Sequence, residues 1–330
     1  MKPALRLLLL AAALAAALLV AVRVGAVPLT AREIVDAAAW GSGDPTTVAI
    51  VRRLRLPRSL LAALVGGALA ASGAVFQALL RNPLADPYVM GVAGGAAVGA
   101  VVAVAAGGLA ASAAPVSVAA FAGAVLAVLL VFRIAASAGR ALDTRVLLLA
   151  GVVAGSFFNA VILLTLTFAD ADSFRSAIFW MMGSFAGATW RGDALLAAYL
   201  VPGLGLLFAL ARPLNLLSVG EETAAYLGTR VERTKLLAYT AASLVTAAAV
   251  AASGVIGFVG LVIPHVVRLL WGGDHRFLLP ASVLLGATFV VLADALARVA
   301  AAPTELPVGV VTAFVGVPFF VWLLRRRSAA

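Results

Sequence analysis

Long apolar runs recur along this chain, and they restrict its possible folds more than any other feature. Because about 20 consecutive apolar residues span the hydrocarbon core of a bilayer, each run is a candidate membrane helix. The runs lie at residues 5–24, 59–80, 88–110, 113–135, 145–169, 193–211, 236–252, 254–271, 277–300 and 306–324. The sequence therefore predicts an all-α membrane protein of about ten transmembrane helices, packed as a compact bundle that forms a single domain over residues 1–330.

The composition fits this class of protein and excludes others. Hydrophobic residues make up 64% of the chain and charged residues 12%, whereas a soluble domain carries about 25% charged residues. Cysteine is absent and only two histidines occur, so we expect no disulfide, thiolate nucleophile or metal site. The only lysines, Lys2 and Lys235, do not follow a glycine, so the Gly-Lys pair of a P-loop is missing. We expect no catalytic residue, no cofactor and no ATP hydrolysis in this chain itself.

The net charge of +10 comes from basic residues that lie mostly in the short segments between the apolar runs. Most of them fall on the side that holds both termini, and the positive-inside rule then places both ends in the cytoplasm. Topology accounts for these charges, so we expect no nucleic-acid partner. A cleaved signal peptide is the alternative for residues 1–26, although the apolar stretch is longer than the core of a signal peptide.

Four arginines, at positions 52, 53, 55 and 58, cluster on the side that should be poor in basic residues. A solvated loop that tolerates its charges is one interpretation. A docking site for an acidic partner outside the cytoplasmic membrane is the other.

A short motif recurs in opposite halves of the chain. Residues 70–73 read Ala-Ala-Ser-Gly, and so do residues 251–254, five predicted helices later. Because an odd offset reverses the direction of a helix in the bilayer, the two copies suggest an inverted five-helix repeat, as in many transporters. Four small residues also recur by chance, and that alternative stays open.

Ionisable residues are nearly missing from the middles of the predicted helices. Ion-coupled carriers usually keep such residues there, so a secondary carrier is disfavoured, while a channel or scaffold without a motor remains an alternative. Residues 213–235, between predicted helices six and seven, form the longest cytoplasmic connection. The stretch 220–228 reads as a short helix closed by glycine, which suits contact with a separate ATPase, with a plain surface hairpin as the alternative.

Five segments resemble the permeases that import ferric siderophores, haem and cobalamin in type II ABC importers. They are RLPRSLLAALVGGALAASGAVFQALLRNPLADPYVMGVAGGA at 55–96, SVGEETAAYLG at 218–228, SGVIGFVGLVIPHVVRLLWGGDHRFLLP at 253–280, ADALAR at 293–298 and LPVGVVTAFVGVPFF at 306–320. The resemblance implies a multi-pass protein of the bacterial cytoplasmic (inner) membrane that moves a metal chelate by alternating access. Its implied partners are a second copy of the chain, two ATP-binding cassette subunits that use ATP and Mg²⁺, and an external substrate-binding protein.

The resemblance also implies where that binding protein docks. In this family, arginines at the external mouth receive acidic residues of the binding protein, and the matching positions are Arg55, Arg58 and Arg298. The charge cluster adds Arg52 and Arg53 as candidates. For Arg298 the alternative is a pair with Asp294, one helical turn earlier.

Two further sites follow from the resemblance. The short cytoplasmic helix resembles the family's ATPase-coupling element, whose residues here are Gly220, Glu221, Glu222, Ala225, Leu227 and Gly228. Its carboxylates would also stabilise the helix N-terminus, which is the alternative role. Predicted helices five and ten are implied to line the pathway, with Gly151, Gly155, Asn159, Thr165, Gly309, Thr312 and Gly316. Close helix packing is the alternative for their small residues.

Overall fold

A computed structural model describes residues 2–25, 27–107, 113–137 and 142–328, and within these ranges it contains helices and no strands. Seven of the described helices are long and apolar enough to cross a membrane. They are α1 (Pro3–Arg23), α4 (Leu56–Leu79), α7 (Ala113–Ser137), α8 (Thr144–Thr167), α10 (Trp190–Ala209), α13 (Val231–Ser253) and α15 (His275–Ala297). Three further apolar helices are α5 (Val92–Ala105), α14 (Val259–Trp271) and α16 (Val308–Ser328). Each predicted run overlaps one of these helices, which confirms the all-α membrane fold.

The structure corrects two of the predicted helix starts. The predicted run at 88–110 opens with a 3-10 turn, η3 (Pro87–Met90), before α5 begins. The run at 254–271 opens with an irregular segment, because Gly254 and Phe258 both have positive φ angles, of 73° and 68°, that end one helix and delay the next. Hydrophobicity alone does not distinguish a buried irregular segment from a buried helix.

Shorter helices lie outside the predicted runs. Residues 27–55 form a cap built from α2 (Ala31–Val35), η1 (Asp36–Trp40), α3 (Pro45–Ala49) and η2 (Ile50–Arg55). The connections contribute α9 (Ala171–Met181), α11 (Ala211–Val219) and α12 (Glu221–Tyr226). Local capping explains two of the starts: Thr30 and Glu33 form a capping box, and the Asp170 carboxylate accepts hydrogen bonds from the first turn of α9.

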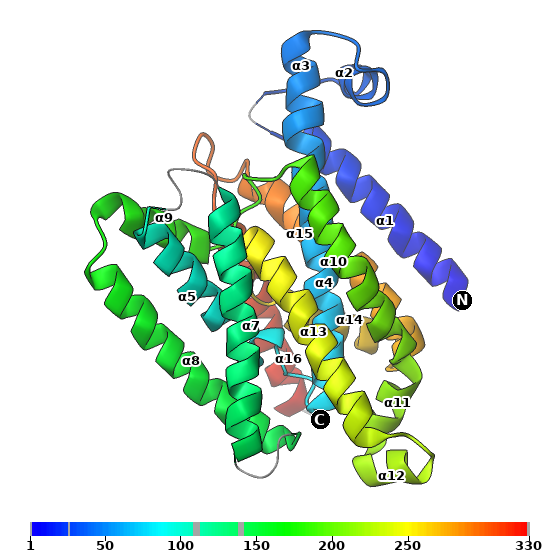
Figure 1. Cartoon of the computed structure of the whole chain (residues 1–330). Helices are drawn as coiled ribbons and strands as arrows, with labels where there is room; N and C mark the ends of the chain where they lie inside the picture. Colours follow the sequence, from blue (N-terminus) through cyan, green and yellow to red (C-terminus); the bar gives the residue numbers. More distant parts are fainter. Residues whose placement is uncertain (1, 26, 108–112, 138–141, 329–330) are drawn as a thin grey trace.

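Helix α4 runs through the centre of the bundle, among α10, α13, α14 and α15 (Figure 1). Glycines allow this close packing: a Cβ atom on Gly73 would lie 1.9 Å from the carbonyl oxygen of Gly260, and one on Gly66 would lie 2.4 Å from that of Gly286. The cap continues into α4 at one end of the bundle, which we call the Arg58 end, and α12 lies at the opposite end, the α12 end (Figure 1). Helices α4 and α13 therefore run in opposite directions.

The two copies of the repeated motif have different surroundings. Gly73 lies inside α4 and packs on α14, whereas Gly254 ends α13 and packs on the carbonyl oxygen of Trp180. Their helices are antiparallel, as the inverted repeat requires, but the motif itself has no common local structure. The repeat stays a prediction.

The break between α13 and α14 is held by side chains from α4 and η3. Pro264 has no N–H, so the carbonyl of Gly260 loses its helical partner, and the Gln77 amide donates to that oxygen at 3.3 Å. The Tyr88 hydroxyl donates to the carbonyl of Ile256 at 2.9 Å and accepts from its N–H at 3.2 Å. These bonds satisfy irregular backbone inside the bundle, as a membrane interior demands.

Candidate functional site

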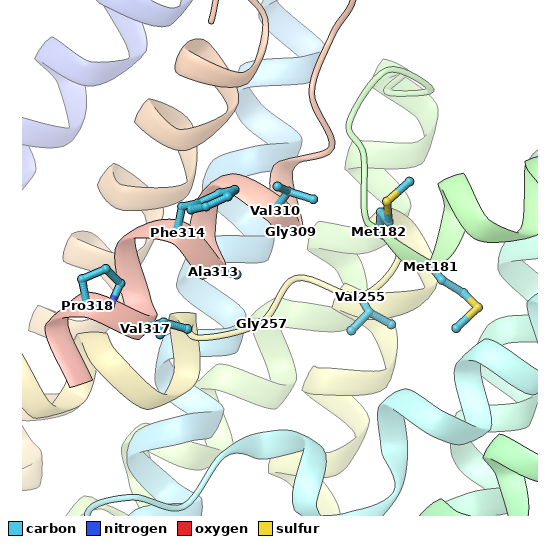
Figure 2. Close-up of a pocket in the computed structure, with 10 residues that line it drawn as sticks. All are labelled: Met181, Met182, Val255, Gly257, Gly309, Val310, Ala313, Phe314, Val317 and Pro318. Carbon is cyan, nitrogen blue, oxygen red and sulfur yellow. The ribbon is translucent and has the colours of Figure 1, made fainter. Parts of the chain in front are cut away.

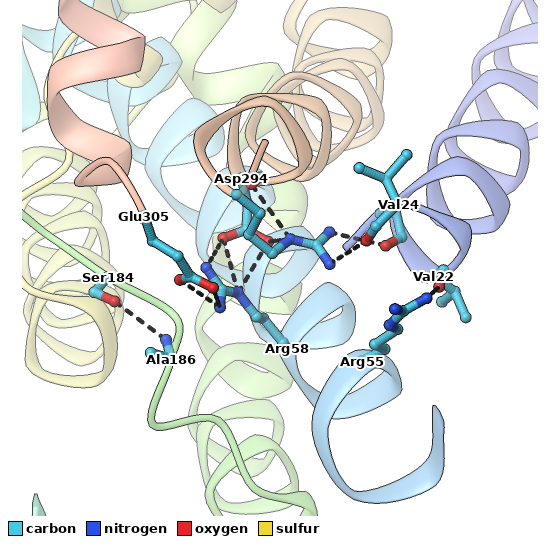
Figure 3. Close-up of polar contacts among 10 residues, drawn as sticks. Val22, Val24, Arg55, Arg58, Ser184, Ala186, Asp294 and Glu305 are labelled. Atoms are coloured by element: carbon cyan, nitrogen blue, oxygen red, sulfur yellow. Dashed lines mark hydrogen bonds and ion pairs between the residues drawn. The ribbon is translucent and has the colours of Figure 1, made fainter. Parts of the chain in front are cut away.

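At the Arg58 end, Arg58 lies between two carboxylates from distant parts of the chain (Figure 3). Its guanidinium contacts Asp294 through two nitrogens at 2.9–3.2 Å, and it contacts Glu305 at 2.9 Å. Asp294 belongs to the last turn of α15, and Glu305 to the connection that leads into α16. Arg58 therefore ties the start of α4 to both neighbouring segments.

Arg55 and Arg298 neutralise the end of α1. The last four carbonyls of a helix lack helical donors and carry its negative dipole end. Arg55 donates to the carbonyls of Val22 and Arg23 at 2.8 and 3.1 Å, and also to that of Val27. Arg298 donates to the carbonyls of Ala21 and Val24 at 2.8 and 2.7 Å. Positive charge at this position therefore has a structural use.

The five predicted docking arginines consequently differ in accessibility. Arg55 and Arg298 are buried, and the alternative pair of Arg298 with Asp294 is present at 3.2 Å. Arg52 is half-buried and donates to three carbonyls that end η1. Arg53 is exposed. A partner would meet Arg53 directly but would meet Arg58 only beside Glu305, and the docking role itself stays a prediction.

At the α12 end, the short helix that the sequence predicted between Gly220 and Gly228 is present as α12. Gly220 and Gly228 have φ angles of 156° and 81°, so glycine permits the turns on both sides of the helix. The buried ammonium group of Lys235 donates to both carboxylate oxygens of Glu221, at 3.0 and 3.1 Å. This ion pair fixes the start of α12 to the base of α13.

The outward face of α12 is free of such contacts within the described part of the chain. Glu222, Ala225, Tyr226, Leu227 and Gly228 are all exposed, and Tyr226 reaches 91% exposure. The aromatic side chain of Tyr226 and the apolar side chain of Leu227 are therefore exposed at the end of α12.

Asn215 of α11 organises the remainder of this end. Its side-chain amide donates to Asp274 at 2.7 Å, and its oxygen accepts from the backbone N–H of His275 at 2.8 Å. The backbone N–H of Arg276 and the Asn215 amide hold the pKa of Asp274 below its usual range, since both donate to its charged form. The segment before α12 is thus bonded to the start of α15.

The predicted pathway residues divide into packing and open positions. Gly151, Thr312 and Gly316 are buried. A Cβ atom on Gly151 would lie 2.1 Å from the carbonyl oxygen of Val89, and one on Gly316 would lie 2.4 Å from the ring of Phe258. These three fit the packing alternative. By contrast, Gly155 faces open space, with no atom of the described residues within 4 Å of its Cβ position, and Asn159 is exposed.

The last two predicted pathway positions are partly open. Thr165 is half-buried and donates to the carbonyl of Val161 at 2.9 Å, within its own helix. Gly309 is half-buried and lines an apolar pocket of about 500 Å³ between the end of α9, the 254–258 break and α16 (Figure 2). The pocket is lined by Met181, Met182, Val255, Gly257, Gly309, Val310, Ala313, Phe314, Val317 and Pro318. Residues of α9, which the sequence did not predict, therefore share a surface with predicted helix ten.

Sequence reasoning missed Glu305 and the pairing of Arg58 with Asp294. The partners are separated by 236 and 247 positions, so no periodic pattern joins them. The available signal was electrostatic: carboxylates near the ends of apolar runs each favour a nearby cation, and the arginine cluster supplies cations. The role of Gln77 as a hydrogen-bond donor was also not predicted. The available signal was Pro264 within a helical run, because a proline leaves the carbonyl four residues earlier without its helical donor.

Fold and site together define a multi-pass membrane protein whose charged residues lie mostly near the ends of its helices and which has an exposed short helix, α12, at one end. The model of the FecCD transport family matches residues 13–326. The chain therefore belongs to the FecCD transport family, whose members include permease subunits of ABC transporters.

Named relatives agree over most of the chain. A cobalamin import system permease protein BtuC of Halobacterium salinarum is 46% identical over 92% of this chain and 81% of its own length. The uncharacterised ABC transporter permease YvrB of Bacillus subtilis is 45% identical over 87% of this chain and 82% of its own length. A solved structure of a metal-chelate type ABC transporter in an inward-facing conformation aligns with a TM-score of 0.87 at 32% identity, covering 98% of this chain and all of that one.

Proposed function

We propose that this chain is the transmembrane permease subunit of an ATP-driven importer that moves a metal chelate, such as a ferric siderophore, haem or cobalamin, into the cytoplasm by alternating access. The observation that carries the proposal is the full-length likeness to the metal-chelate type transporter, at 32% identity and a TM-score of 0.87. The cobalamin permeases among the relatives support the same cargo class.

The two ends of the bundle suit two different partners. We assign the α12 end to the cytoplasm, where α12 would seat on one of two ATP-binding cassette subunits that hold the ATP and Mg²⁺. We assign the Arg58 end to the outside, where a binding protein would deliver its cargo to a dimer of this chain. The missing P-loop in the sequence supports a separate motor.

For the pathway, we propose the open positions on α8 together with the pocket beside α16. Gly155, Asn159 and Thr165 lie on one helix, and Gly309 lies in the pocket wall. Gly151, Thr312 and Gly316 would then support this surface from behind through close packing. A wide apolar surface with few polar groups suits a bulky chelate whose selection is left to the binding protein.

The proposal is tested by uptake in proteoliposomes that contain this chain and its ATPase, with the binding protein outside. Cobalamin, haem and a ferric hydroxamate siderophore are compared as cargo, and ATP inside the vesicles should drive accumulation of one of them. ATP-dependent uptake of none of the three, with an assembled and ATP-hydrolysing complex, would contradict the proposed cargo class.

The pathway assignment has a matched pair of variants. Gly155→Trp fills open space on α8, and Gly205→Trp fills open space on α10, since among the described residues no atom lies within 4 Å of either Cβ position. Both variants should fold. Uptake should fall at least about tenfold in Gly155→Trp alone, because a bulky group in the pathway costs the moving cargo about 1.4 kcal/mol or more at that point. Equal uptake by the two variants would remove α8 from the pathway.

A further inference from the structure

The two carboxylates held by Arg58 are not equivalent. The side chain of Asp294 is 1% exposed and meets two guanidinium nitrogens, whereas the side chain of Glu305 is 47% exposed and meets one. Arg298 is a second cation on Asp294, at 3.2 Å. Asp294 is therefore enclosed by its partners, and Glu305 covers Arg58 from the solvent side.

Exchange with a carboxylate from outside is possible at only one of these positions. Removing one partner of a buried ion pair leaves an uncompensated charge in a water-poor site, which is strongly unfavourable. An exposed pair contributes little, because water and salt replace the lost contact. Glu305 can therefore leave Arg58 at small cost, while Asp294 stays in place.

Glu305 also belongs to an exposed connection between two helices. It lies three residues before α16, in the connection that follows α15. Downstream of Glu305 the backbone is fixed: the N–H of Leu306 donates to Ala297, and those of Val308 and Gly309 donate to Gly183 and Met182, which adjoin the pocket. Upstream, residues 299–305 are exposed, and several of their backbone N–H groups donate locally, as that of Thr304 does to Ala301 at 3.0 Å. The contact with Arg58 ties this exposed stretch to the start of α4.

The net positive charge of the cluster favours binding of a carboxylate from a partner protein. Arg55, Arg58 and Arg298 carry three positive charges against the two negative charges of Asp294 and Glu305. When Glu305 moves away, the net positive charge of the cluster rises by one unit, and an incoming carboxylate lowers it again. The planar guanidinium of Arg58 can donate to the new carboxylate as it donates to Glu305.

We propose that Glu305 is an internal placeholder: on docking, a carboxylate of the binding protein replaces Glu305 on Arg58 and releases the 299–305 connection that leads to α16. The proposal rests on the proposed function, because it takes an acidic docking partner as given. It assigns Arg58 a contact with both partners in turn, and it makes the entrance to α16 responsive to docking.

The test uses the absence of cysteine from the chain, which allows a single spin label at Thr304→Cys in the complete complex. Label motion is recorded with and without the substrate-binding protein from the same genome, in the otherwise unchanged chain and in Glu305→Ala. Asp36→Ala is the matched control, since it removes another carboxylate from an arginine pair at the same end. Docking affinity is measured on the same samples.

We expect docking to raise label motion in the unchanged chain, and Glu305→Ala to raise it without any partner. Docking should be about two- to fivefold tighter in Glu305→Ala, the range of an exposed ion pair, and unchanged in Asp36→Ala. In an Arg58→Lys background, which keeps a cation beside Asp294 but loses the fork, the gain from Glu305→Ala should shrink.

A label that stays restrained while the binding protein docks normally would overturn the placeholder and leave the docking proposal intact. Equal tightening in Asp36→Ala would also overturn it, because general repulsion would then explain the affinity. If the binding protein fails to dock on any variant, the docking part of the proposed function fails, and the exchange fails with it.

Discussion

The Arg58 end and the α12 end of this bundle both depend on ion pairs, but they use them differently. At the Arg58 end, three arginines are shared among two carboxylates and the free carbonyls of α1, and most of this charge is buried. At the α12 end, one buried lysine holds one half-exposed glutamate and leaves the outer face of a short helix free. The first end is a connected network, and the second presents a preformed surface.

The two ends therefore differ in which of their parts can move. A network of buried charges resists opening, so movement there is confined to its exposed member, Glu305. A helix of six residues is marginal by itself, so the position of α12 depends on the pair of Glu221 with Lys235. We expect disturbance of the first end to affect the whole fold and disturbance of the second to affect α12 alone.

The largest effect should come from Asp294→Ala. This change leaves Arg58 and Arg298 facing each other without the carboxylate that they share, and it should lower the free energy of unfolding by about 3–5 kcal/mol. Unfolding in mixed detergent, followed by helical circular dichroism, measures the loss. Asp36→Ala, at an exposed pair of 3.7 Å, should cost under about 1 kcal/mol. Equal losses in the two variants would mean that the Arg58 network is not cooperative.

A smaller and local effect should follow from Lys235→Met. Methionine fills the buried space of the lysine stem but releases Glu221, so amide hydrogen exchange in residues 222–227 should accelerate about 5- to 30-fold, the equivalent of about 1–2 kcal/mol. Exchange in the middle of α13 should not change. Glu222→Gln, which alters an exposed carboxylate on the same helix, is the control and should leave exchange in α12 nearly as it was.

The smallest effect on stability should come from Arg53→Glu. Arg53 is exposed, so the free energy of unfolding should stay within about 0.5 kcal/mol of the original value. The association rate of the binding protein should nevertheless fall several-fold and lose part of its salt dependence, since exposed charges act mainly on encounter. Arg212→Glu makes the same charge change on α11 and should not affect docking. A similar loss in both variants would point to net charge and not to the Arg58 end.

The sequence predicted the membrane helices well because the cost of placing polar groups in a bilayer acts on each segment separately. Each apolar run contains a helix in the structure, and the glycine-bounded stretch 220–228 contains α12. Hydrophobicity alone did not locate the break at 254–258, since its residues are as apolar as their neighbours and its stability comes from Tyr88 and Gln77, which are distant in the chain.

The sites were predictable in position but only partly in role. Charge counting located the arginines at one end, yet it could not tell exposed Arg53 from buried Arg55, because burial depends on where α1 ends. The glycines of α8 show the same limit: Gly151 and Gly155 are one turn apart, but only the tertiary structure reveals that one packs on Val89 and the other is open.

In the proposed function, a separate ATPase drives cargo movement from the α12 end. The most direct test measures cargo uptake into proteoliposomes under two energy sources, with the complete complex and its binding protein. We predict uptake with internal ATP when ionophores have collapsed every ion gradient, and no uptake with ion gradients when ATP is absent. Gradient-driven uptake without ATP, or passive equilibration without either source, would contradict the claim and identify a secondary carrier or a channel instead.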